Sequence, residues 1–452
     1  MKKLLILGAG PGGYECAVRA ARRGLEVHIV DKTEHLGGTC LSEGCIPTKC
    51  LCHTAEILRS AREAETYGLQ ISGTFSLSAA MQRKNEVIAR LQEGIAGLLS
   101  SPGIHFHEGL ARFVPGDAHC VEVGGERLSA DYIIIATGSV SKFLPIPGAH
   151  IPGVLTSTEM LQLQEVPARL CIIGGGVIGL EFASIFKAFG SEVTVIEYAK
   201  EILPFFDKDL AKRLRTALKK QGINIITGAP VTAIHADNST NGELHISYEF
   251  RSSVCEVKVD KVLMAVGRGA NLQTLNLSEV GIAYTPRGII VNEHMETNIP
   301  GVYAVGDVTG LIQLAHAATA QSFRALAHIL GEQDSTNPNL VPAAVFTTPE
   351  AAMVGMTEEE AKAKVPGLQC KKSFYRANGR ALSMEADGSG MVKLLVSPDG
   401  EIVGAHILGA HAAELIHEIA VVMQSAAGSE LLSHTIHAHP TLSELLQKAA
   451  ES

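Results

Sequence analysis

Two cysteines near the N-terminus have a spacing that could support redox chemistry, Cys40 and Cys45. In an ideal helix their Cα atoms would lie ~8.6 Å apart, from the rise and radius of the helix. A disulfide needs less than ~7 Å, so the pair can bridge only if this turn is distorted. Gly44 permits the distortion, and Pro47 suits an early helical position, which would place Cys45 near a helix N-terminus and lower its thiol pKa. The alternative is a pair of inert buried cysteines, which is our interpretation of Cys50 and Cys52.

A metal site is the other chemistry that close cysteines can support. The Cys-x4-Cys spacing is not that of a zinc knuckle, and no Cys-x2-Cys partner occurs elsewhere in the chain. We therefore expect no metal to be bound.

A thiol reaction also needs a base, and histidine titrates near neutral pH. Among 18 histidines, His439 is set apart by Pro440, which fixes the backbone after it. Local sequence alone favours a surface histidine here. It also favours a helix-capping role for Glu444, because Thr441 and Glu444 have capping-box spacing. His434 and His437 are interpreted as non-catalytic.

Two glycine triplets predict the elements that position this chemistry. Each follows an apolar run and precedes a helical pattern that stops at a glycine, and each is followed by a second strand ending in an acid. The interval from first glycine to acid is 23 residues in both copies, Gly8 to Asp31 and Gly174 to Glu197. This is the pattern of a dinucleotide-binding strand–turn–helix–strand unit, with the pyrophosphate at the helix N-terminus and the acid on a ribose hydroxyl. Glu197 would repel a 2′-phosphate, so NAD is favoured over NADP.

Composition narrows the class of protein. The chain has 452 residues, 46% of them hydrophobic, and a net charge of −9. These values exclude a largely disordered chain and argue against nucleic-acid binding. No run of about 18 apolar residues occurs, so no membrane span is expected. Nine cysteines without a secretion signal argue against a disulfide scaffold and predict a cytoplasmic setting.

Several motifs occur in order along the chain and resemble those of the flavoprotein disulfide reductase family. Within the family they are most similar to the dihydrolipoamide dehydrogenases, over residues 4–444. The motifs are the two glycine triplets, the cysteine segment 37–49, Ala136-Thr137-Gly138, Gly267-Arg268, residues 297–307 and residues 437–444.

The resemblance implies an NAD-dependent enzyme that oxidises protein-bound dihydrolipoamide through a Cys40–Cys45 disulfide and FAD. It makes Cys40 the interchange thiol and Cys45 the thiolate beside the flavin. His439 becomes the acid–base, oriented by Glu444 and contributed by the other subunit of a homodimer. Lys49 and Glu181 are implied as a pair near the flavin.

The resemblance also implies cofactor contacts and partners. The expected partner is a lipoyl domain or lipoyl protein of a 2-oxoacid dehydrogenase or glycine-cleavage complex. FAD would contact Gly8, Gly10, Gly13, Asp31, Lys32, Gly38, Thr39, Lys49, Ala111, Thr137, Gly138, Asp307, Ala315 and His316. NAD would contact Gly174, Gly176, Gly179, Glu197, Val231 and Gly267.

The predicted fold class is α/β, with two Rossmann-like dinucleotide-binding domains and a C-terminal α+β dimerisation domain. Residues 1–145 and 269–338 would form the FAD-binding and central parts, residues 146–268 the NAD-binding domain and residues 339–452 the interface domain. Helices are expected over 80–100, over 200–222 from near Pro204, and over 412–426. Strands are expected over 390–396 and 402–408.

Three departures from the family pattern stand out. Gly269-Ala270 replaces Arg-Pro, the charged residues that commonly follow Leu314-Ala315-His316 are absent, and Asp31 replaces glutamate.

An NADP-linked, glutathione reductase-like enzyme is the alternative, and Glu197 argues against it. Mercuric ion reductase and high-molecular-weight thioredoxin reductase fit poorly, because both need a C-terminal cysteine pair and the last cysteine here is Cys370. A structural subunit docked to an acyltransferase core would be a role additional to catalysis.

Overall fold

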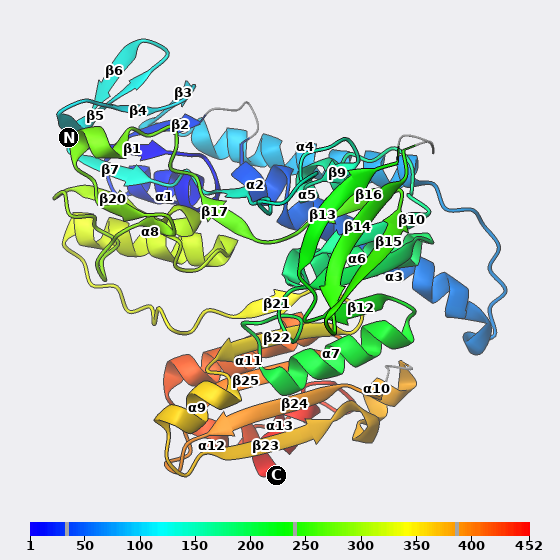
Figure 1. Cartoon of the computed structure of the whole chain (residues 1–452). Coiled ribbons are helices and arrows are strands. Elements are labelled where there is room, and N and C mark those ends of the chain that lie inside the picture. Colours follow the sequence, from blue (N-terminus) through cyan, green and yellow to red (C-terminus); the bar gives the residue numbers. More distant parts are fainter. Residues whose placement is uncertain (32–35, 238–241, 385–387) are drawn as a thin grey trace. The chain divides into compact units, whose positions relative to one another are not determined.

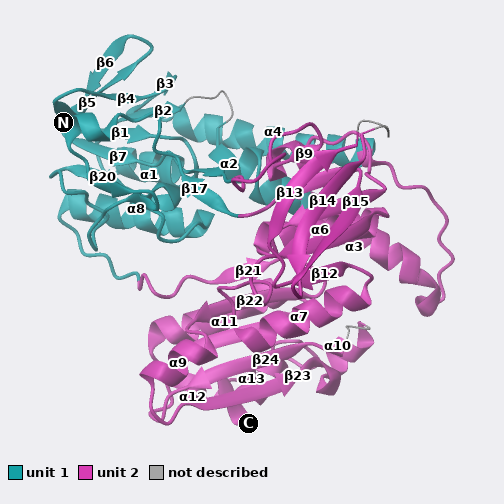
Figure 2. Cartoon of the chain, in the orientation of Figure 1, with its two compact units in different colours: residues 1–50, 78–142, 267–336 teal, residues 51–77, 143–266, 337–452 magenta. Residues whose placement is uncertain are grey.

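The computed structural model describes residues 1–31, 36–237, 242–384 and 388–452 (Figure 1). The chain forms two compact units (Figure 2). The first comprises residues 1–50, 78–142 and 267–336, and the second comprises residues 51–77, 143–266 and 337–452. Among the described residues, no helix combines the length and apolar character that crossing a membrane requires.

A five-stranded parallel sheet forms the centre of the first unit, in the order β20-β7-β1-β2-β3. Its middle strand, β1, is an unbroken apolar run after its first residue, Lys3, as expected of a strand covered on both faces. Helices α1 and α8 pack on one face and a small antiparallel sheet, β4-β5-β6, on the other. The bounds are β1 Lys3–Leu7, α1 Pro11–Arg22, β2 Glu26–Asp31, β3 Ile104–Glu108, β4 Arg112–Val114, β5 Asp117–Val123, β6 Glu126–Ser129, β7 Tyr132–Ile135, β20 Val302–Ala304 and α8 Ala315–Leu330.

The remaining elements carry the residues of chemical interest in this unit, where α3 is included only as far as Cys50. The cysteine segment contributes α2 and the start of α3, and β8 pairs with β17 in antiparallel fashion. Two further strands, β18 and β19, form a hairpin. The bounds are α2 Gly38–Ser42, α3 Cys45–Glu63, α4 Leu77–Leu99, β8 Ser139–Ser141, β17 Arg268–Ala270, η2 Leu277–Val280, β18 Tyr284–Thr285, β19 Gly288–Ile289 and η3 Gly306–Thr309.

The second unit contains the other glycine-rich repeat. Its parallel sheet has the order β12-β11-β10-β16-β9, and an antiparallel sheet, β13-β14-β15, adjoins it in the hydrophobic core. The bounds are η1 Ala64–Tyr67, β9 Val154–Leu155, α5 Ser157–Met160, β10 Arg169–Ile173, α6 Val177–Phe189, β11 Glu192–Glu197, α7 Lys208–Lys220, β12 Asn224–Thr227, β13 Val231–Ala236, β14 Leu244–Phe250, β15 Ser253–Val259 and β16 Lys261–Met264.

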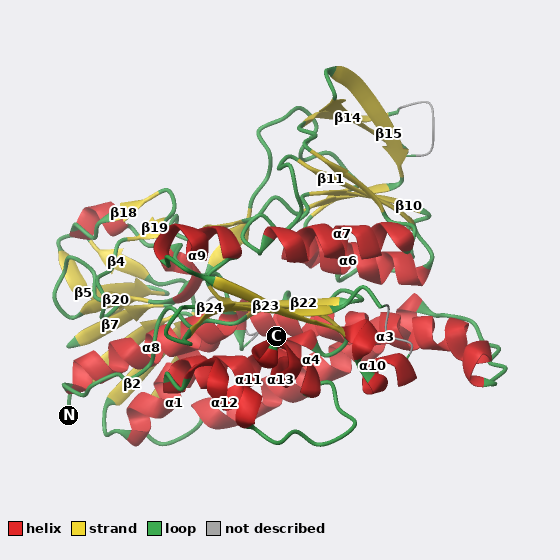
Figure 3. Ribbon diagram, turned by 90° about the horizontal axis from the view of Figure 1, so that it is seen from below, coloured by secondary structure: helices red, strands yellow, loops and turns green. Residues whose placement is uncertain are grey.

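The C-terminal part of the second unit is an antiparallel sheet in the order β21-β22-β25-β24-β23. Helices α11, α12 and α13 pack against it around one hydrophobic core (Figure 3). The bounds are β21 Ala343–Val345, β22 Glu350–Gly355, α9 Glu358–Lys364, β23 Gln369–Phe374, η4 Tyr375–Ala377, α10 Gly379–Ser383, β24 Met391–Val396, β25 Ile402–Gly409, α11 Ala412–Ser425, α12 Gly428–His434 and α13 Glu444–Glu451.

The predicted fold class is confirmed: two Rossmann-like parallel sheets precede a C-terminal α+β part. The helix expected from near Pro204 instead begins at Lys208, because Asp207 caps it by accepting from the backbone N–H groups of Asp209 and Leu210. The other expected helices and strands lie within a few residues of their predicted bounds. The four-part division by residue range stays a prediction.

Candidate active site

The third glycine of each triplet is required by close packing. A Cβ atom on Gly13 would lie 1.8 Å from the carbonyl oxygen of Gly8, and one on Gly179 would lie 2.1 Å from that of Gly174. Each helix therefore begins directly against its strand–turn. A Cβ on Gly176 would meet nothing within 4 Å. A Cβ on Gly10 would meet only the Cα of Gly38, at 4.0 Å. Both helix N-termini thus leave room for a pyrophosphate group beside their second glycine. Both loops fit a dinucleotide on this ground.

The acid that ends each second strand is tied to its own glycine loop. Asp31 Oδ2 accepts from the backbone N–H of Ala9 at 2.6 Å. In the second copy, Glu197 Oε2 accepts from Gly175 N at 2.5 Å, and its Oε1 accepts from Ala199 N at 2.6 Å. The two copies therefore share a hydrogen bond that fixes the loop conformation. The expected contact of these acids with a ribose stays a prediction.

The cysteine segment packs on the first glycine loop. Gly37 N donates to Ala9 O at 3.0 Å, and a Cβ on Gly38 would lie 2.8 Å from the Cα of Gly10. Thr39 follows in the same helix, α2. Within the first unit, Cys40 is therefore carried by an element held directly against a candidate nucleotide site.

The distortion required for a Cys40–Cys45 disulfide is present. The helix is interrupted between the two residues, since α2 ends at Ser42 and Cys45 is the first residue of α3. A hydrogen bond with Cys45 and burial raise the pKa of the Cys40 thiol, while the Lys49 ammonium opposes this shift. The raised pKa of Cys40 favours the protonated form of this thiol in the reduced pair.

A partly buried polar chain in the same unit was not predicted. Arg268 Nε donates to Ser139 Oγ at 2.8 Å, and Ser139 Oγ donates to Asp307 Oδ2 at 2.5 Å. Burial lowers the pKa of Arg268, and the charges of Asp307, Glu43 and Cys45 oppose this. The guanidinium therefore interacts electrostatically with the Cys45 thiolate. The Gly267-Arg268 motif was recognised, but only the glycine was given a role, because nothing in the sequence placed Arg268 near Cys45.

The other residues expected to contact FAD belong to the first unit, but their surroundings differ. Ala111 is buried in the core beneath β4-β5-β6. Thr137, the residue before Gly138, donates from its Oγ1 to Asn271 O at 3.1 Å. Ala315 and His316 begin α8. Lys32 lies outside the described residues.

The residues expected at NAD divide between the units. Gly174, Gly176, Gly179, Glu197 and Val231 belong to the second unit, whereas Gly267 belongs to the first.

Lys49 and Glu181 also belong to different units. Glu181 is 3% exposed, and its Oε1 accepts from Phe346 N at 3.0 Å. Their pairing stays a prediction.

His439 and Glu444 form a hydrogen-bonded pair in the second unit. His439 Nδ1 lies 2.9 Å from Glu444 Oε1, while the histidine side chain is 81% exposed. This bond, with a second from the backbone N–H of Thr441, lowers the pKa of Glu444. The ring is therefore oriented through Nδ1, and Nε2 is open to an incoming group.

Only half of the capping box considered for this segment forms: the Glu444 carboxylate accepts from the Thr441 backbone N–H, but the Thr441 hydroxyl caps no helix N–H. The N-cap of α13 is Ser443 and not Thr441. The Thr441 hydroxyl donates to Ala438 O. His437, interpreted as non-catalytic, has its Nε2 2.7 Å from Glu418 Oε1 and its side chain 5% exposed.

Comparison with known proteins identifies two matching families. Residues 2–322 match the family described as pyridine nucleotide-disulphide oxidoreductase, and residues 341–450 match its dimerisation domain. A dihydrolipoyl dehydrogenase of Bacillus subtilis is 38% identical, covering 99% of this chain and 97% of that protein. One from Thermus scotoductus is 40% identical, covering 99% and 96%. Among solved structures, the HOCl-induced flavoprotein disulfide reductase RclA of Escherichia coli has a TM-score of 0.87 at 33% identity, covering 99% of both chains.

Proposed function

The chain belongs to the pyridine nucleotide-disulphide oxidoreductase family, and we propose that it is a dihydrolipoyl dehydrogenase that uses FAD and NAD. The observation that carries this is the joint presence of a helix broken between Cys40 and Cys45 and a histidine oriented by Glu444. Both occur in a chain similar over 99% of its length to dihydrolipoyl dehydrogenases. When bound, FAD and NAD⁺ supply the electron acceptors.

The thiol chemistry follows from the two sulfurs. A substrate thiolate attacks Cys40 Sγ, the Cys40–Cys45 bond breaks, and Cys45 leaves as a thiolate. The second substrate thiolate then attacks the mixed disulfide, which releases the cyclic disulfide product and leaves Cys40 as the second thiol. The pKa of Cys40, raised by Cys45 and by burial, keeps the remaining proton on Cys40. The Arg268 cation stabilises the charge on Cys45.

The proton is handled by His439. Its Nδ1 is held by Glu444, so Nε2 takes the proton from the first substrate thiol and releases it to solvent. Nε2 then takes the proton from the second substrate thiol and returns it to Cys40 as that sulfur leaves the mixed disulfide. We propose that this histidine acts on the cysteines of the other subunit in a homodimer. The match to a dimerisation domain at residues 341–450 supports dimer formation.

The substrate, the setting and the remaining site assignments are part of the same proposal. A lipoyl group on a lipoyl domain or lipoyl protein, of a 2-oxoacid dehydrogenase or glycine-cleavage complex, is the proposed substrate. A cytoplasmic setting suits a disulfide that must open at every turnover. We retain Lys49 with Glu181 near the flavin, and residues 1–145 with 269–338, 146–268 and 339–452 as the FAD-binding, NAD-binding and interface regions.

The proposal is tested with the purified yellow protein. Turnover is measured with dihydrolipoamide and NAD⁺, and separately with glutathione disulfide and NADPH. We expect turnover with the first pair alone. Turnover only with the second pair would refute the proposal and favour the glutathione reductase-like alternative.

A second candidate is a disulfide reductase of other specificity, favoured by the 33% identity to RclA. It shares the cysteine chemistry but not the substrate. Turnover of NADH with a range of low-molecular-weight disulfides, and none with dihydrolipoamide, would establish it.

A further inference from the structure

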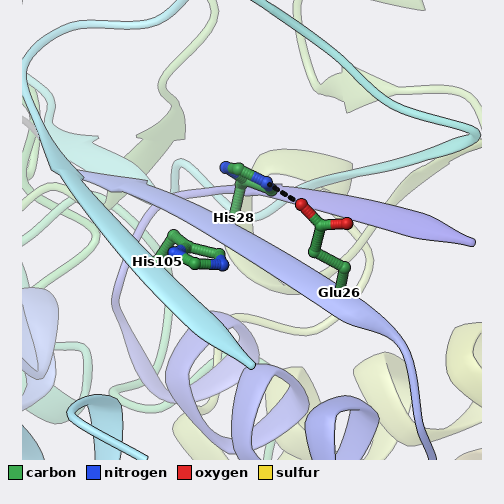
Figure 4. Close-up of side chains that lie close together, drawn as sticks. All are labelled: Glu26, His28 and His105. Atoms are coloured by element: carbon green, nitrogen blue, oxygen red, sulfur yellow. Dashed lines mark hydrogen bonds and ion pairs between the residues drawn. The ribbon is translucent and has the colours of Figure 1, made fainter. Parts of the chain in front are cut away.

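Three histidines and one glutamate gather on one face of β2 and β3 in the first unit. Glu26 and His28 alternate along β2, and His105 and His107 alternate along β3, so each pair projects to one face of its strand. The strands are adjacent and parallel, with His28 opposite His105. β3 is the edge of the sheet, and His105 is exposed. Figure 4 shows Glu26, His28 and His105 close together.

The contacts within the cluster hold His28 at its centre. His28 Nε2 lies 3.2 Å from Glu26 Oε1, and His28 Nδ1 lies 2.9 Å from His107 Nε2. The rings of His105 and His107 stack against it, with centroids 4.9 Å and 5.1 Å away. One donor atom from each of Glu26, His28 and His105 falls within 4.8 Å of the others.

We propose that Glu26, His28 and His105 bind a divalent transition-metal ion of the Zn²⁺ class. Two imidazoles and one carboxylate are a ligand set that Zn²⁺ accepts, with a fourth position for water. Metal–ligand bonds of 2.0–2.2 Å in a tetrahedron place donor atoms about 3.4 Å apart. The Glu26–His28 separation of 3.2 Å matches this. The donor atom of His105 lies within 4.8 Å of the other two, and this exposed side chain on the edge strand must move closer to complete the tetrahedron.

His107 has a supporting role in this arrangement. When His28 binds through Nε2, its Nδ1–H donates to His107 Nε2, which fixes the tautomer and the ring orientation. This is the usual task of a residue behind a metal-bound histidine.

The site is distinct from the cofactor chemistry. Glu26 begins β2 and Asp31 ends it, so the cluster lies toward the opposite end of the strand from the glycine loop. The sequence prediction of no metal considered only cysteine spacing. The paired patterns Glu-x-His and His-x-His become one cluster only when β2 and β3 pair.

Two features compete with the proposal and shape its test. Lys3 Nζ lies 3.4 Å from Glu26 Oε1 and competes with a metal ion for this carboxylate oxygen. A second group, Asp237, Glu243 and His245, has comparable spacing. There, Arg169 Nη1 at 2.8 Å and Lys258 Nζ at 3.7 Å already neutralise Glu243. We therefore use His245 as a control.

The experiment titrates FAD-bound enzyme with Zn²⁺ in competition with a chromogenic chelator. The enzyme is kept oxidised, so that Cys40 and Cys45 cannot act as thiol ligands. The variants are His105→Ala and His28→Gln, with His245→Ala and His53→Ala as controls. His53 is an exposed histidine with Glu56 3.1 Å away.

We expect the wild type and both controls to bind one Zn²⁺ that His105→Ala and His28→Gln lose. His107→Phe should weaken binding about 10- to 100-fold. Because His105 is exposed, its replacement is compatible with normal folding, which the flavin content checks. Equal Zn²⁺ binding by the wild type and His105→Ala, no binding by the wild type, or loss of the ion with His245→Ala would each overturn the proposal.

Discussion

Replacing Lys393 with methionine tests the buried charge network of the second unit. Lys393 on β24 is 0% exposed, and its Nζ lies 2.8 Å and 2.9 Å from the two carboxylate oxygens of Asp207. Its Nζ also lies 2.5 Å from Glu358 Oε2. The substitution removes the cation and leaves the Asp207 carboxylate buried, with backbone N–H donors and His406 Nε2 at 3.9 Å.

The expected loss of stability in Lys393→Met follows from the burial of the ion pair. Breaking a buried ion pair by removing one partner costs about 3–5 kcal/mol, because an uncompensated charge remains. Lys372 supplies a matched control, since it lies opposite Lys393 in the sheet and binds Asp209 Oδ2 at 2.8 Å with its side chain 30% exposed. A pair of that exposure contributes about 0–1 kcal/mol. Both lysines therefore bind an aspartate carboxylate, but only Lys393 is fully buried.

The assay is thermal unfolding of the FAD-bound enzyme followed by circular dichroism. At about 2–4 °C per kcal/mol for a unit of this size, Lys393→Met should lower Tm by roughly 6–20 °C. Lys372→Met should lower it by no more than about 4 °C. Adding Asp207→Asn to Lys393→Met should recover part of the loss, since asparagine still caps α7. Equal effects of the two lysine variants would refute the argument from burial.

Three further predictions concern pH, the acid–base pair and the glycine loops. Burial lowers the pKa of His406 to about 4 from 6.5, against the attraction of Asp207. The unfolded chain therefore takes up the proton first, and about 3 kcal/mol of stability, present above pH 6.5, is lost as pH falls toward 4. His406→Gln should flatten the dependence of Tm on pH in that window, and an unchanged slope would contradict the assignment. His439→Gln should lower kcat with dihydrolipoamide by ~10²–10⁴. Glu444→Gln should lower it by less, with normal flavin content in both variants, and full activity of His439→Gln would exclude it as the base. Gly179→Ala, whose Cβ would lie 2.1 Å from Gly174 O, should raise the KM for NAD⁺ while FAD stays bound. Gly97→Ala in α4, where a Cβ meets nothing within 4 Å, is its control and should leave the KM unchanged.

Much of the fold was predictable because its signals are local. The two glycine triplets and their acids specify strand–turn–helix–strand units within about 25 residues each. The structure adds that Asp31 and Glu197 each bond to their own loop. The start of α7 was misplaced because Pro204 suits a first helical turn, whereas the capping carboxylate of Asp207 determines the actual start.

The site was predictable in part. Cys40, Cys45, His439 and Glu444 could be named from motifs, and the broken helix between the cysteines could be argued from geometry. The hydrogen-bonded chain of Arg268, Ser139 and Asp307 could not be predicted from the sequence. Ser139 is 129 residues from Arg268 and 168 residues from Asp307, and it meets Arg268 only because β8 and β17 pair. The histidine cluster on β2 and β3 was missed for the same reason.

The central claim is that dihydrolipoamide passes electrons through Cys40 and Cys45 to NAD⁺. The most direct measurement is NADH formation from dihydrolipoamide and NAD⁺ by the wild type and by Cys40→Ser and Cys45→Ser, each purified with bound FAD. The account predicts steady NADH formation by the wild type and its loss in both variants. Sustained NADH formation by either serine variant would contradict it.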